Sequence, residues 1–184
     1  MPYGLKRYQQ AESLHFITFS CCRRLTFLSD PDPKSLVEQQ PERTRARHRA
    51  RIYGYVIMPE HLHLLMNEPP AIVVAQFIKS FKQETSRILK GDRKQFWQIR
   101  YSDRNISGED DRSGVIRYIH RNPVKRGLVA APELYAWSSF DHYSTGRRGT
   151  VEIESEWTAA DRRRILTQAG RAVSVDPLIA MKLR

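Results

Sequence analysis

The sequence predicts an α+β fold, and the order of its apolar segments predicts which one. Strand-like runs and helical patterns follow one another as β-α-β-β-α-β, the split pattern of a ferredoxin-like domain with a central antiparallel sheet. The 184 residues are 40% hydrophobic and 10% aromatic, which suffices for a packed core. Because roughly 150 residues make one domain, the length fits one domain followed by a tail.

The first strand and the first helix open the pattern. Residues 15–20 (HFITFS) are β-branched and aromatic, which favours a strand. Asp32 is a candidate N-cap with Pro33 in the first helical turn, and Pro41 interrupts the helix, whose length stays open. Arginine then recurs at every second position from Arg43 to Arg51. We interpret these arginines as a solvated charged face leading into a strand, with DNA contact as the alternative.

A strand pair and the clearest helix follow. Residues 52–58 (IYGYVIM) and 61–66 (HLHLLM) lie on either side of a short turn-like break and predict an antiparallel pair at the centre of the sheet. After Pro69-Pro70, apolar residues recur at spacings of three and four over 74–89, which predicts an amphipathic helix ending before Gly91.

The remaining elements are less regular. Residues 96–101 (FWQIRY) predict either the last strand or an aromatic and basic loop. A further helix is expected to begin near Asp110-Asp111 and to stop at Asn122-Pro123. Apolar residues within 133–143 should dock on the domain. We therefore predict a domain over residues 1–148 and a polar tail over 149–184 with one or two short helices.

Charge and cysteine content narrow the function classes. Lys and Arg total 31 against 20 Asp and Glu, so the net charge is +11, which favours a polyanionic partner. Cys21 and Cys22 are adjacent, which excludes a disulfide scaffold and a Cys-rich zinc site. No apolar run has the length of a signal peptide or a membrane span. We expect a reduced, cytoplasmic protein that does not use a membrane.

Two histidines stand in the most apolar segment. His61 and His63 are two apart, so on a strand their side chains emerge on one face while Leu62 and Leu64 point to the other. This spacing lets two imidazoles converge on a metal ion. The alternative is a pair of structural histidines that hydrogen-bond to backbone or solvent.

The next helix offers two more candidates. Tyr118 and Asn122 are four residues apart and share one side of that helix, so the Asn122 amide could supply a third metal ligand. The alternative for Asn122 is a helix cap before Pro123. Tyr118 falls on the boundary between the apolar side and a basic side that carries Arg117 and Arg121, which suits either a catalytic or a structural tyrosine.

Two longer strings resemble the signature blocks of the REP-associated tyrosine transposases. They are residues 56–66 (VIMPEHLHLLM) and residues 118–129 (YIHRNPVKRGLV), and a later block at 137–140 (WSSF) is also similar. These proteins are relatives of single-tyrosine HUH transposases, in which two histidines flank one hydrophobic residue. The likeness extends from about residue 18 to residue 143. Arg126 departs from it, because a small residue is common at that position.

The resemblance implies a ferredoxin-like domain with a catalytic helix after the core. It implies cleavage and rejoining of single-stranded DNA through a 5′-phosphotyrosine on Tyr118, with Mg²⁺ or Mn²⁺ held by His61, His63 and Asn122. The implied partner is a palindromic DNA hairpin with a guide sequence on its 5′ side. A monomer and a homodimer both stay open.

Basic and aromatic side chains around these blocks are the expected DNA contacts. They are Arg93, Lys94, Trp97, Arg100, Arg104, Arg117, Arg121, Lys125 and Arg126. The alternative for Trp97 is a place in the core. Two other functions also remain open: a hairpin-binding regulator without catalysis, and a metal-dependent phosphodiesterase in which Tyr118 is structural.

Overall fold

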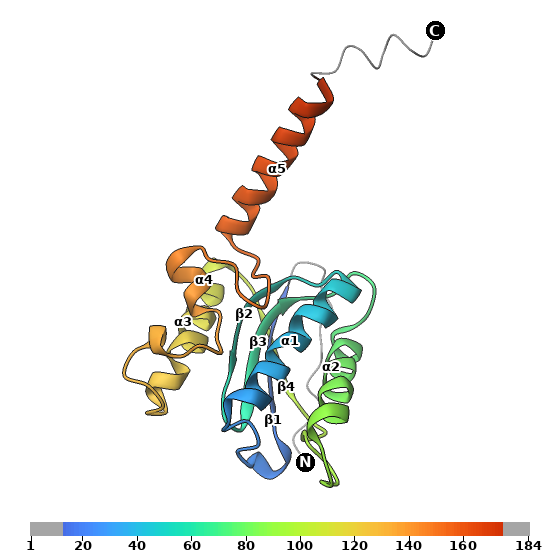
Figure 1. The fold of residues 1–184 in the computed structure, drawn as a ribbon, viewed down its shortest axis with the longest axis vertical. Coiled ribbons are helices and arrows are strands. Elements are labelled where there is room, and N and C mark those ends of the chain that lie inside the picture. The colour runs from blue at the N-terminus through green and yellow to red at the C-terminus, as the bar shows by residue number, and fades with distance from the viewer. Residues whose placement is uncertain (1–12, 175–184) are drawn as a thin grey trace. The chain divides into compact units, whose positions relative to one another are not determined.

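A four-stranded antiparallel sheet organises the chain (Figure 1). The computed structural model describes residues 13–174, with side chains through residue 167. The strands are β1 (Leu14–Ser20), β2 (Ile52–Ile57), β3 (His61–Asn67) and β4 (Ser102–Ile106), in the spatial order β2-β3-β1-β4. The helices are α1 (Pro31–His48), α2 (Val74–Leu89), α3 (Glu109–Lys125), α4 (Phe140–Thr145) and α5 (Glu156–Ser174), with short 3₁₀ turns η1 (Cys22–Arg24) and η2 (Pro132–Leu134). The predicted ferredoxin-like α+β fold is confirmed.

The alternation of side chains along each strand separates two cores. On β1 and β3, Ile17, Phe19, Leu62 and Leu64 point to the face that α1 and α2 cover. The face toward α3 receives Leu65 and the residues that share its parity. Figure 1 shows α1 and α2 on one side of the sheet and α3 on the other. The two histidines of β3 therefore lie on the α3 face, as the strand periodicity predicts.

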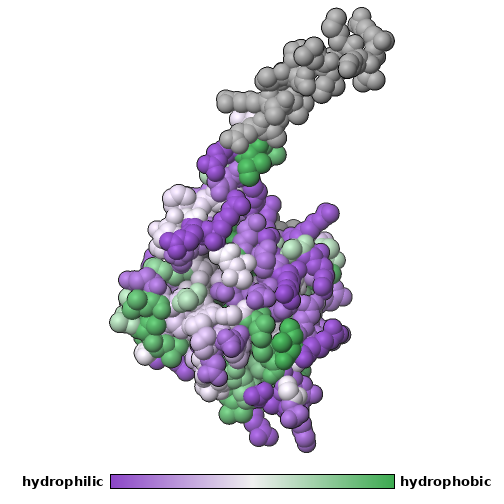
Figure 2. Space-filling view, viewed as in Figure 1, coloured by the Kyte–Doolittle hydropathy of each residue, from purple (hydrophilic) through white to green (hydrophobic). Residues whose placement is uncertain are grey.

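Helix α2 has the amphipathic pattern expected of it. Phe77, Ile78 and Phe81 are buried against the sheet, and the following turns end at Leu89. The outward sides of α1 and α2 are mostly hydrophilic in Figure 2. Burial of these three apolar side chains anchors the helix on the sheet. Its exposed side carries Lys79 and Arg87.

Helix α1 differs from its prediction at both ends. It begins at Pro31 after the N-cap Asp30, two residues before the expected cap at Asp32, and it continues through Pro41 to His48. Pro41 is buried on the sheet side, and this packing offsets the backbone hydrogen bond that a proline cannot donate. Arg49 ends the helix in a left-handed conformation. Most of the arginine series is therefore helical surface and does not form a strand.

The last strand lies later than the sequence predicts. Residues 96–101 form no strand, apart from a single bridge between Trp97 and Cys21, and β4 covers Ser102–Ile106 instead. Phe96 and Trp97 both insert into the core beside Phe19. The Trp97 indole donates a hydrogen bond to Thr85 Oγ1 at 2.7 Å. Because this segment fills the core, the strand pairing moves to the more polar residues that follow.

Helix α3 also passes the proline at which it was expected to stop. It continues over Asn122 and Pro123 to Lys125, so Asn122 is a residue of the helix and does not cap it. Gly127, at φ 67°, then lets the Leu128 amide reach back to the Pro123 carbonyl at 2.9 Å. The last turn is thus stabilised from beyond the helix, and Asn122 keeps a fixed place on its inner side.

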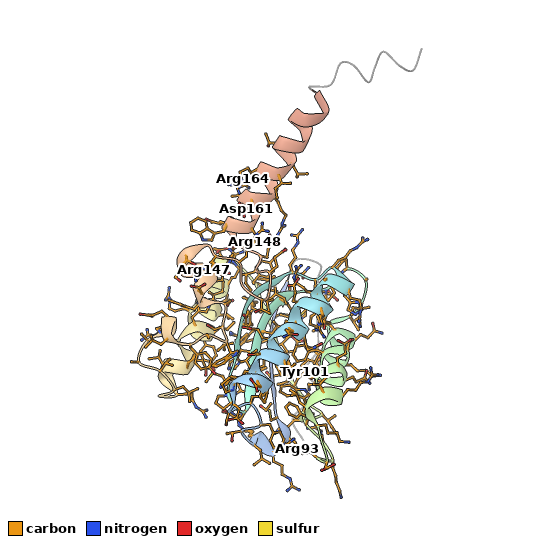
Figure 3. All side chains as sticks on the ribbon, viewed as in Figure 1. Arg93, Tyr101, Arg147, Arg148, Asp161 and Arg164 are labelled. Carbon is orange, nitrogen blue, oxygen red and sulfur yellow. The ribbon has the colours of Figure 1, made fainter. Side chains whose placement is uncertain are left out.

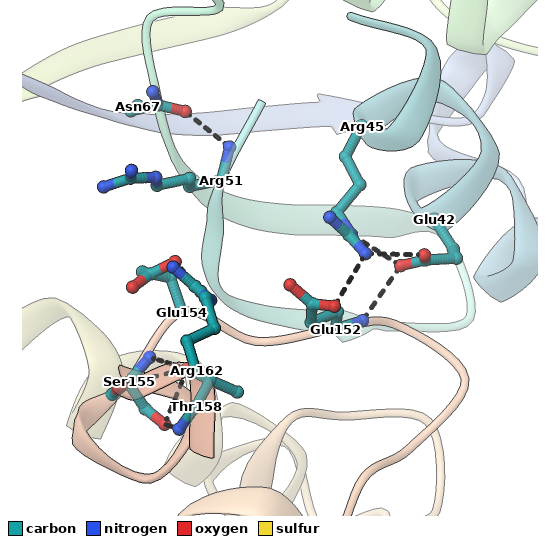
Figure 4. A network of polar contacts seen from close by, with 9 residues as sticks. All are labelled: Glu42, Arg45, Arg51, Asn67, Glu152, Glu154, Ser155, Thr158 and Arg162. Atoms are coloured by element: carbon teal, nitrogen blue, oxygen red, sulfur yellow. Dashed lines mark hydrogen bonds and ion pairs between the residues drawn. The ribbon is translucent and has the colours of Figure 1, made fainter. Parts of the chain in front are cut away.

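The compact unit extends beyond residue 148. Val151 and Ile153 are buried in the main core, and Ile153 forms a parallel bridge with Ile52. The Glu152 amide donates to Glu42 Oε2 at 2.9 Å, and its carboxylate lies 3.2 Å from the Arg45 guanidinium (Figure 4). The first unit therefore ends at Ile153, five residues later than the sequence predicts.

The second unit begins at Glu154. Its described residues, 154–174, contain one helix of 19 residues, α5, where the sequence predicts one or two short helices. Ser155 and Thr158 exchange hydrogen bonds at its start, in the manner of a capping box, and Arg162 pairs with Glu154 (Figure 4). Within residues 13–174, no helix is long and apolar enough to cross a membrane.

The position of Trp97 in the core gives a stability test. Trp97 is 3% exposed, whereas Ile99 in the same loop is 86% exposed. We expect Trp97→Ala to lower the free energy of unfolding by about 3–5 kcal/mol, and Ile99→Ala to change it by less than about 0.5 kcal/mol. Urea unfolding followed by circular dichroism measures both. Equal effects of the two substitutions would contradict this placement of Trp97.

Candidate active site

Two buried imidazoles meet at the start of β3. His61 and His63 point to the α3 face, and their Nε2 atoms lie 3.0 Å apart. The side chains are only 4% and 5% exposed, in an otherwise apolar strand. Polar groups buried in this way need partners, so their surroundings decide what the pair can do.

The Nδ1 atom of each imidazole has a polar neighbour. Thr18, which is directly opposite His63 in the β1–β3 register, places its Oγ1 2.7 Å from His63 Nδ1. Glu60 Oε1 lies 3.1 Å from His61 Nδ1, at ion-pair distance but outside hydrogen-bond geometry. Both Nε2 atoms are therefore left to face inward, which is how metal-binding histidines are usually supported.

Asn122 brings a third group from α3. Its Nδ2 is 3.2 Å from His63 Nε2, while its Oδ1 is buried without a hydrogen-bond partner. A 180° turn of the amide exchanges these two atoms and presents the oxygen to the histidine pair, since oxygen and nitrogen have nearly the same shape. The side chain predicted as a third ligand thus lies beside the two predicted imidazoles.

These three groups fit a divalent cation. Metal–nitrogen distances of about 2.1 Å put two neighbouring ligands at right angles about 3.0 Å apart, the separation seen between the two Nε2 atoms. Burial, the neighbouring His61 and the nearby Arg24 lower the pKa of His63 to about 3. Burial lowers the pKa of His61 as well. Both rings are therefore neutral at pH 7, as metal binding requires.

The donor set is small. Among residues 13–174, no three His, Cys, Asp or Glu side chains gather into a metal-binding cluster. A cation held by two imidazoles and one amide would keep open positions for water or for a ligand's oxygen atoms. Open positions of this kind are typical of catalytic metal sites, whereas structural sites are closed by four protein ligands.

Tyr118 stands at the edge of this cluster. Its ring centroid lies 5.3 Å from that of His63 and 5.9 Å from that of Phe16, and its side chain is 41% exposed. Lys125, two turns further along α3, places its ammonium 5.8 Å from the Tyr118 ring. Core packing thus holds the ring beside the candidate metal site, and solvent can still reach the residue.

Comparison with known proteins shows which family this chain belongs to. A family described as "Transposase IS200 like" matches residues 9–122, which is more than half of the chain. The chain belongs to the IS200-like transposase family. A Haemophilus influenzae protein named as a REP-associated tyrosine transposase is 31% identical over 97 residues, which cover 46% of this chain. The chain spans 55% of that relative's length.

A solved structure supports the fold of this IS200-like transposase. It is titled as a REP-associated tyrosine transposase bound to a REP hairpin, and it aligns with 83% of this chain and 92% of its own. The TM-score is 0.68 and the sequence identity is 21%. At this identity the likeness establishes the shared fold.

Glu60 and Thr18 are site residues that the sequence motifs do not single out. The Glu60 carboxylate is buried and lies 2.9 Å from Arg126 and 3.4 Å from Arg24. Arg126, predicted as a DNA contact, thus ties the end of α3 to the residue before His61. The sequence offered one signal for Glu60, an acidic residue directly before a histidine and between two apolar runs. Thr18 had none, because only the strand register brings it to His63.

The other predicted DNA contacts divide between two regions of this IS200-like transposase. Arg117, Arg121 and Lys125 are exposed on α3, and Arg104 is exposed on β4. Three other predicted DNA contacts are exposed in the loop between α2 and β4, namely Arg93, Lys94 and Arg100. Figure 3 shows Arg93 at the lower end of the domain. The prediction for Trp97 is wrong, because a buried indole cannot stack on bases.

A basic groove adjoins that loop. It has a volume of about 930 Å³ and lies between α2 and residues 90–101. Its cationic lining residues are Lys79, Lys82, Arg87, Lys90 and Lys94. Lys82 is held by the Gln98 carbonyl at 2.9 Å, and burial lowers its pKa to about 8. The other four are exposed and present positive charge to a polyanion.

His120 is excluded as a proton acceptor for Tyr118. It is buried on another side of α3, where its Nε2 lies 2.9 Å from Ser139 Oγ. Burial lowers its pKa to about 4. The residue therefore joins α3 to the segment before α4 and has a structural role.

The low pKa of His63 gives a pH test of this site. Between pH 7 and pH 5 the unfolded chain takes up a proton at residue 63, whereas the folded chain does not, so the free energy of unfolding falls as the pH falls. We expect about 2 kcal/mol of this loss to come from His63, and His63→Gln to remove that part. Urea unfolding at each pH, with a chelator present, measures it. The same pH dependence in both proteins would contradict the burial of a neutral imidazole.

Proposed function

We propose that this chain cleaves and rejoins single-stranded DNA next to a palindromic hairpin, through a covalent bond between Tyr118 and the DNA. The observation that carries the proposal is the convergence of His61, His63 and Asn122 beside a half-exposed tyrosine. A structural histidine pair would not require a third polar group with a buried, unpartnered oxygen at the same point.

The choice of DNA as substrate rests on charge and on kinship. The chain carries a net charge of +11. Exposed cations lie on α3 next to Tyr118 and around the groove of α2. A similar protein of known structure is titled as bound to a REP hairpin, and we extend that ligand class to this chain.

A divalent cation, Mg²⁺ or Mn²⁺, would be held by His61, His63 and Asn122. When bound, it supplies positive charge that polarises the scissile phosphate and stabilises the departing oxygen. Oxygen ligands suit these hard ions, and the open positions would be filled by phosphate oxygen and water. Thr18, at hydrogen-bond distance from His63, and Glu60, at ion-pair distance from His61, would support the two imidazoles from the side away from the cation.

The residues on α3 would perform the transfer. The Tyr118 oxygen attacks the phosphorus while the bond to the 3′ oxygen breaks, which gives a 5′-phosphotyrosine and a free 3′-hydroxyl. The phenol gives up one proton, and the departing oxygen gains one. Lys125, whose ammonium lies near the Tyr118 ring, would attract the phosphate to this residue.

The covalent intermediate explains rejoining. Because the phosphodiester becomes a phosphotyrosine ester of similar energy, a second 3′-hydroxyl can reverse the step and join new strands. Because Tyr118 is the one proposed nucleophile in each chain, each chain would hold one DNA end at a time. Joining two ends would therefore use a second active site or two successive events.

The hydroxyl of Tyr118 is the critical test. With Mn²⁺ or Mg²⁺ and a hairpin that carries a 5′ single-stranded extension, the parent protein should form a DNA adduct that survives denaturing electrophoresis. Tyr118→Phe should abolish the adduct and lower cleavage by at least about a hundredfold, because it removes the nucleophile. The control is Tyr53→Phe, on the far edge strand β2, which should react like the parent.

The same assay separates the alternatives. Hairpin binding without cleavage at any divalent metal would identify a regulator without catalysis. Cleavage that survives in Tyr118→Phe and releases free 5′-phosphate would identify a metal-dependent phosphodiesterase. Either result would overturn the proposed covalent mechanism.

Support of the histidines by Thr18 gives a second test. Thr18→Val keeps the side-chain shape and removes the oxygen 2.7 Å from His63 Nδ1, so we expect the affinity for Mn²⁺ to fall about 10- to 100-fold. Isothermal titration calorimetry without DNA measures this. Thr85→Val, which alters a buried threonine within α2, is the matched control and should bind Mn²⁺ like the parent. Equal affinities in all three proteins would contradict this role for Thr18.

A further inference from the structure

Among the helices of residues 13–174, none covers the half of the active-site face that β1 and β4 form. Helix α3 packs on β2 and β3 through its own residues Val115 and Ile119, which are part of the smaller core. On the other half of this face, β1 contributes Phe16 and Thr18, which are only partly buried. Arg104 on β4 is exposed, as is its neighbour Ser102.

The strand register joins these side chains directly to the histidines. Thr18 is opposite His63 on one side and opposite Ser102 on the other. Phe16 is opposite Arg104 in the next row. Side chains of paired residues emerge on the same face, so a continuous row leads from the histidine pair to the edge strand β4.

Phe16 connects this row to both reacting parts of the site. Its ring stacks on His63 at a centroid distance of 5.4 Å and an interplanar angle of 23°. It also meets the edge of Tyr118 at 5.9 Å, and the Arg104 guanidinium lies 5.6 Å from its centroid. Within the described part of the chain, Arg104 has no acidic partner.

Asp103 and Ile106 make the buried contacts of β4. Asp103 and Asn105 point to the opposite face, where Asp103 pairs with buried His15 at 2.9 Å. Ile106 closes the smaller core at the far end of the strand. Arg104 and Ser102 are the side chains of β4 that face solvent next to the site, so packing does not account for them.

From this arrangement we propose that the uncovered half of the sheet is the binding track for the single strand that adjoins the scissile phosphate. Phe16 is a stacking platform for an unpaired base, and Arg104 pairs with a backbone phosphate. An aromatic face beside a guanidinium is the combination that proteins use to hold single strands without reading their sequence. The inference rests on the proposed function, since it assumes that DNA reaches Tyr118.

The experiment uses Tyr118→Phe as the background, so that bound DNA stays intact. The probes are a labelled oligothymidylate, a blunt hairpin, and the same hairpin with a single-stranded 5′ extension. We expect Phe16→Leu and Arg104→Gln each to weaken binding of the oligothymidylate and the extended hairpin about tenfold. Both should leave binding of the blunt hairpin within about twofold, as measured by fluorescence anisotropy.

Salt dependence separates the two contacts. Arg104→Gln should reduce the slope of log affinity against log salt by about 0.7, because one phosphate contact is lost. Phe16→Leu should leave the slope unchanged. The matched controls are Tyr53→Leu and Arg112→Ala. These two residues form another pair of an arginine over an aromatic ring, at the opposite edge of the sheet. Both should bind all three probes like the background protein.

The proposed track would be wrong if the Phe16 and Arg104 variants bound the oligothymidylate and the extended hairpin with the same affinity as the two controls. Loss of affinity for the blunt hairpin to the same extent would also overturn it, since that result means a general effect on DNA binding or folding. The outcomes separate from those of the proposed function. If the background protein does not bind either hairpin but binds oligothymidylate through Phe16 and Arg104, the proposed binding track is supported and the proposed hairpin substrate is wrong.

Discussion

The site depends on the register between β1 and β3. The pleat of β3 turns His61 and His63 to one face, and burial there would be unfavourable without partners for their nitrogens. The register supplies Thr18 to His63, while α3 crosses the same face and supplies Asn122. A shift of one residue would turn the histidines into the core under α2 and separate them from both partners. The strand pairing therefore sets the face on which the histidines meet Thr18 from β1 and Asn122 from α3.

The electrostatics of the site are organised around neutral ligands. Two uncharged imidazoles and one amide bring no negative charge, so a cation bound there would keep its full charge toward a phosphodiester. The nearby carboxylate, Glu60, contacts the outer nitrogen of His61 and is balanced by Arg126 and Arg24. The acid thus supports the site from behind and does not compete with the phosphate.

The sequence predicted those parts of the site that depend on local periodicity. A spacing of two on a strand placed His61 and His63, and a spacing of four on a helix placed Tyr118 and Asn122. It failed where tertiary packing overrides local signals. Trp97 sits among basic residues yet fills the core, and Pro123 lies within α3 because contacts from beyond the helix stabilise its last turn. Thr18 carries no local signal at all, since only a pairing distant in sequence brings it to His63.

The uneven covering of the sheet connects the fold to its chemistry. Helices α1 and α2 pack on one face, whereas on the other face, within residues 13–174, α3 packs on β2 and β3 and leaves β1 and β4 without a helix. A second helix over β1 and β4 would bury Arg104 without an acidic partner, at a cost that packing could not offset. The polar residues of β4 therefore favour an open half-face, and this face begins where His63, Phe16 and Tyr118 touch. A ligand of extended shape and negative charge fits such a surface better than a small molecule, because it can reach the histidines and the exposed arginine at once.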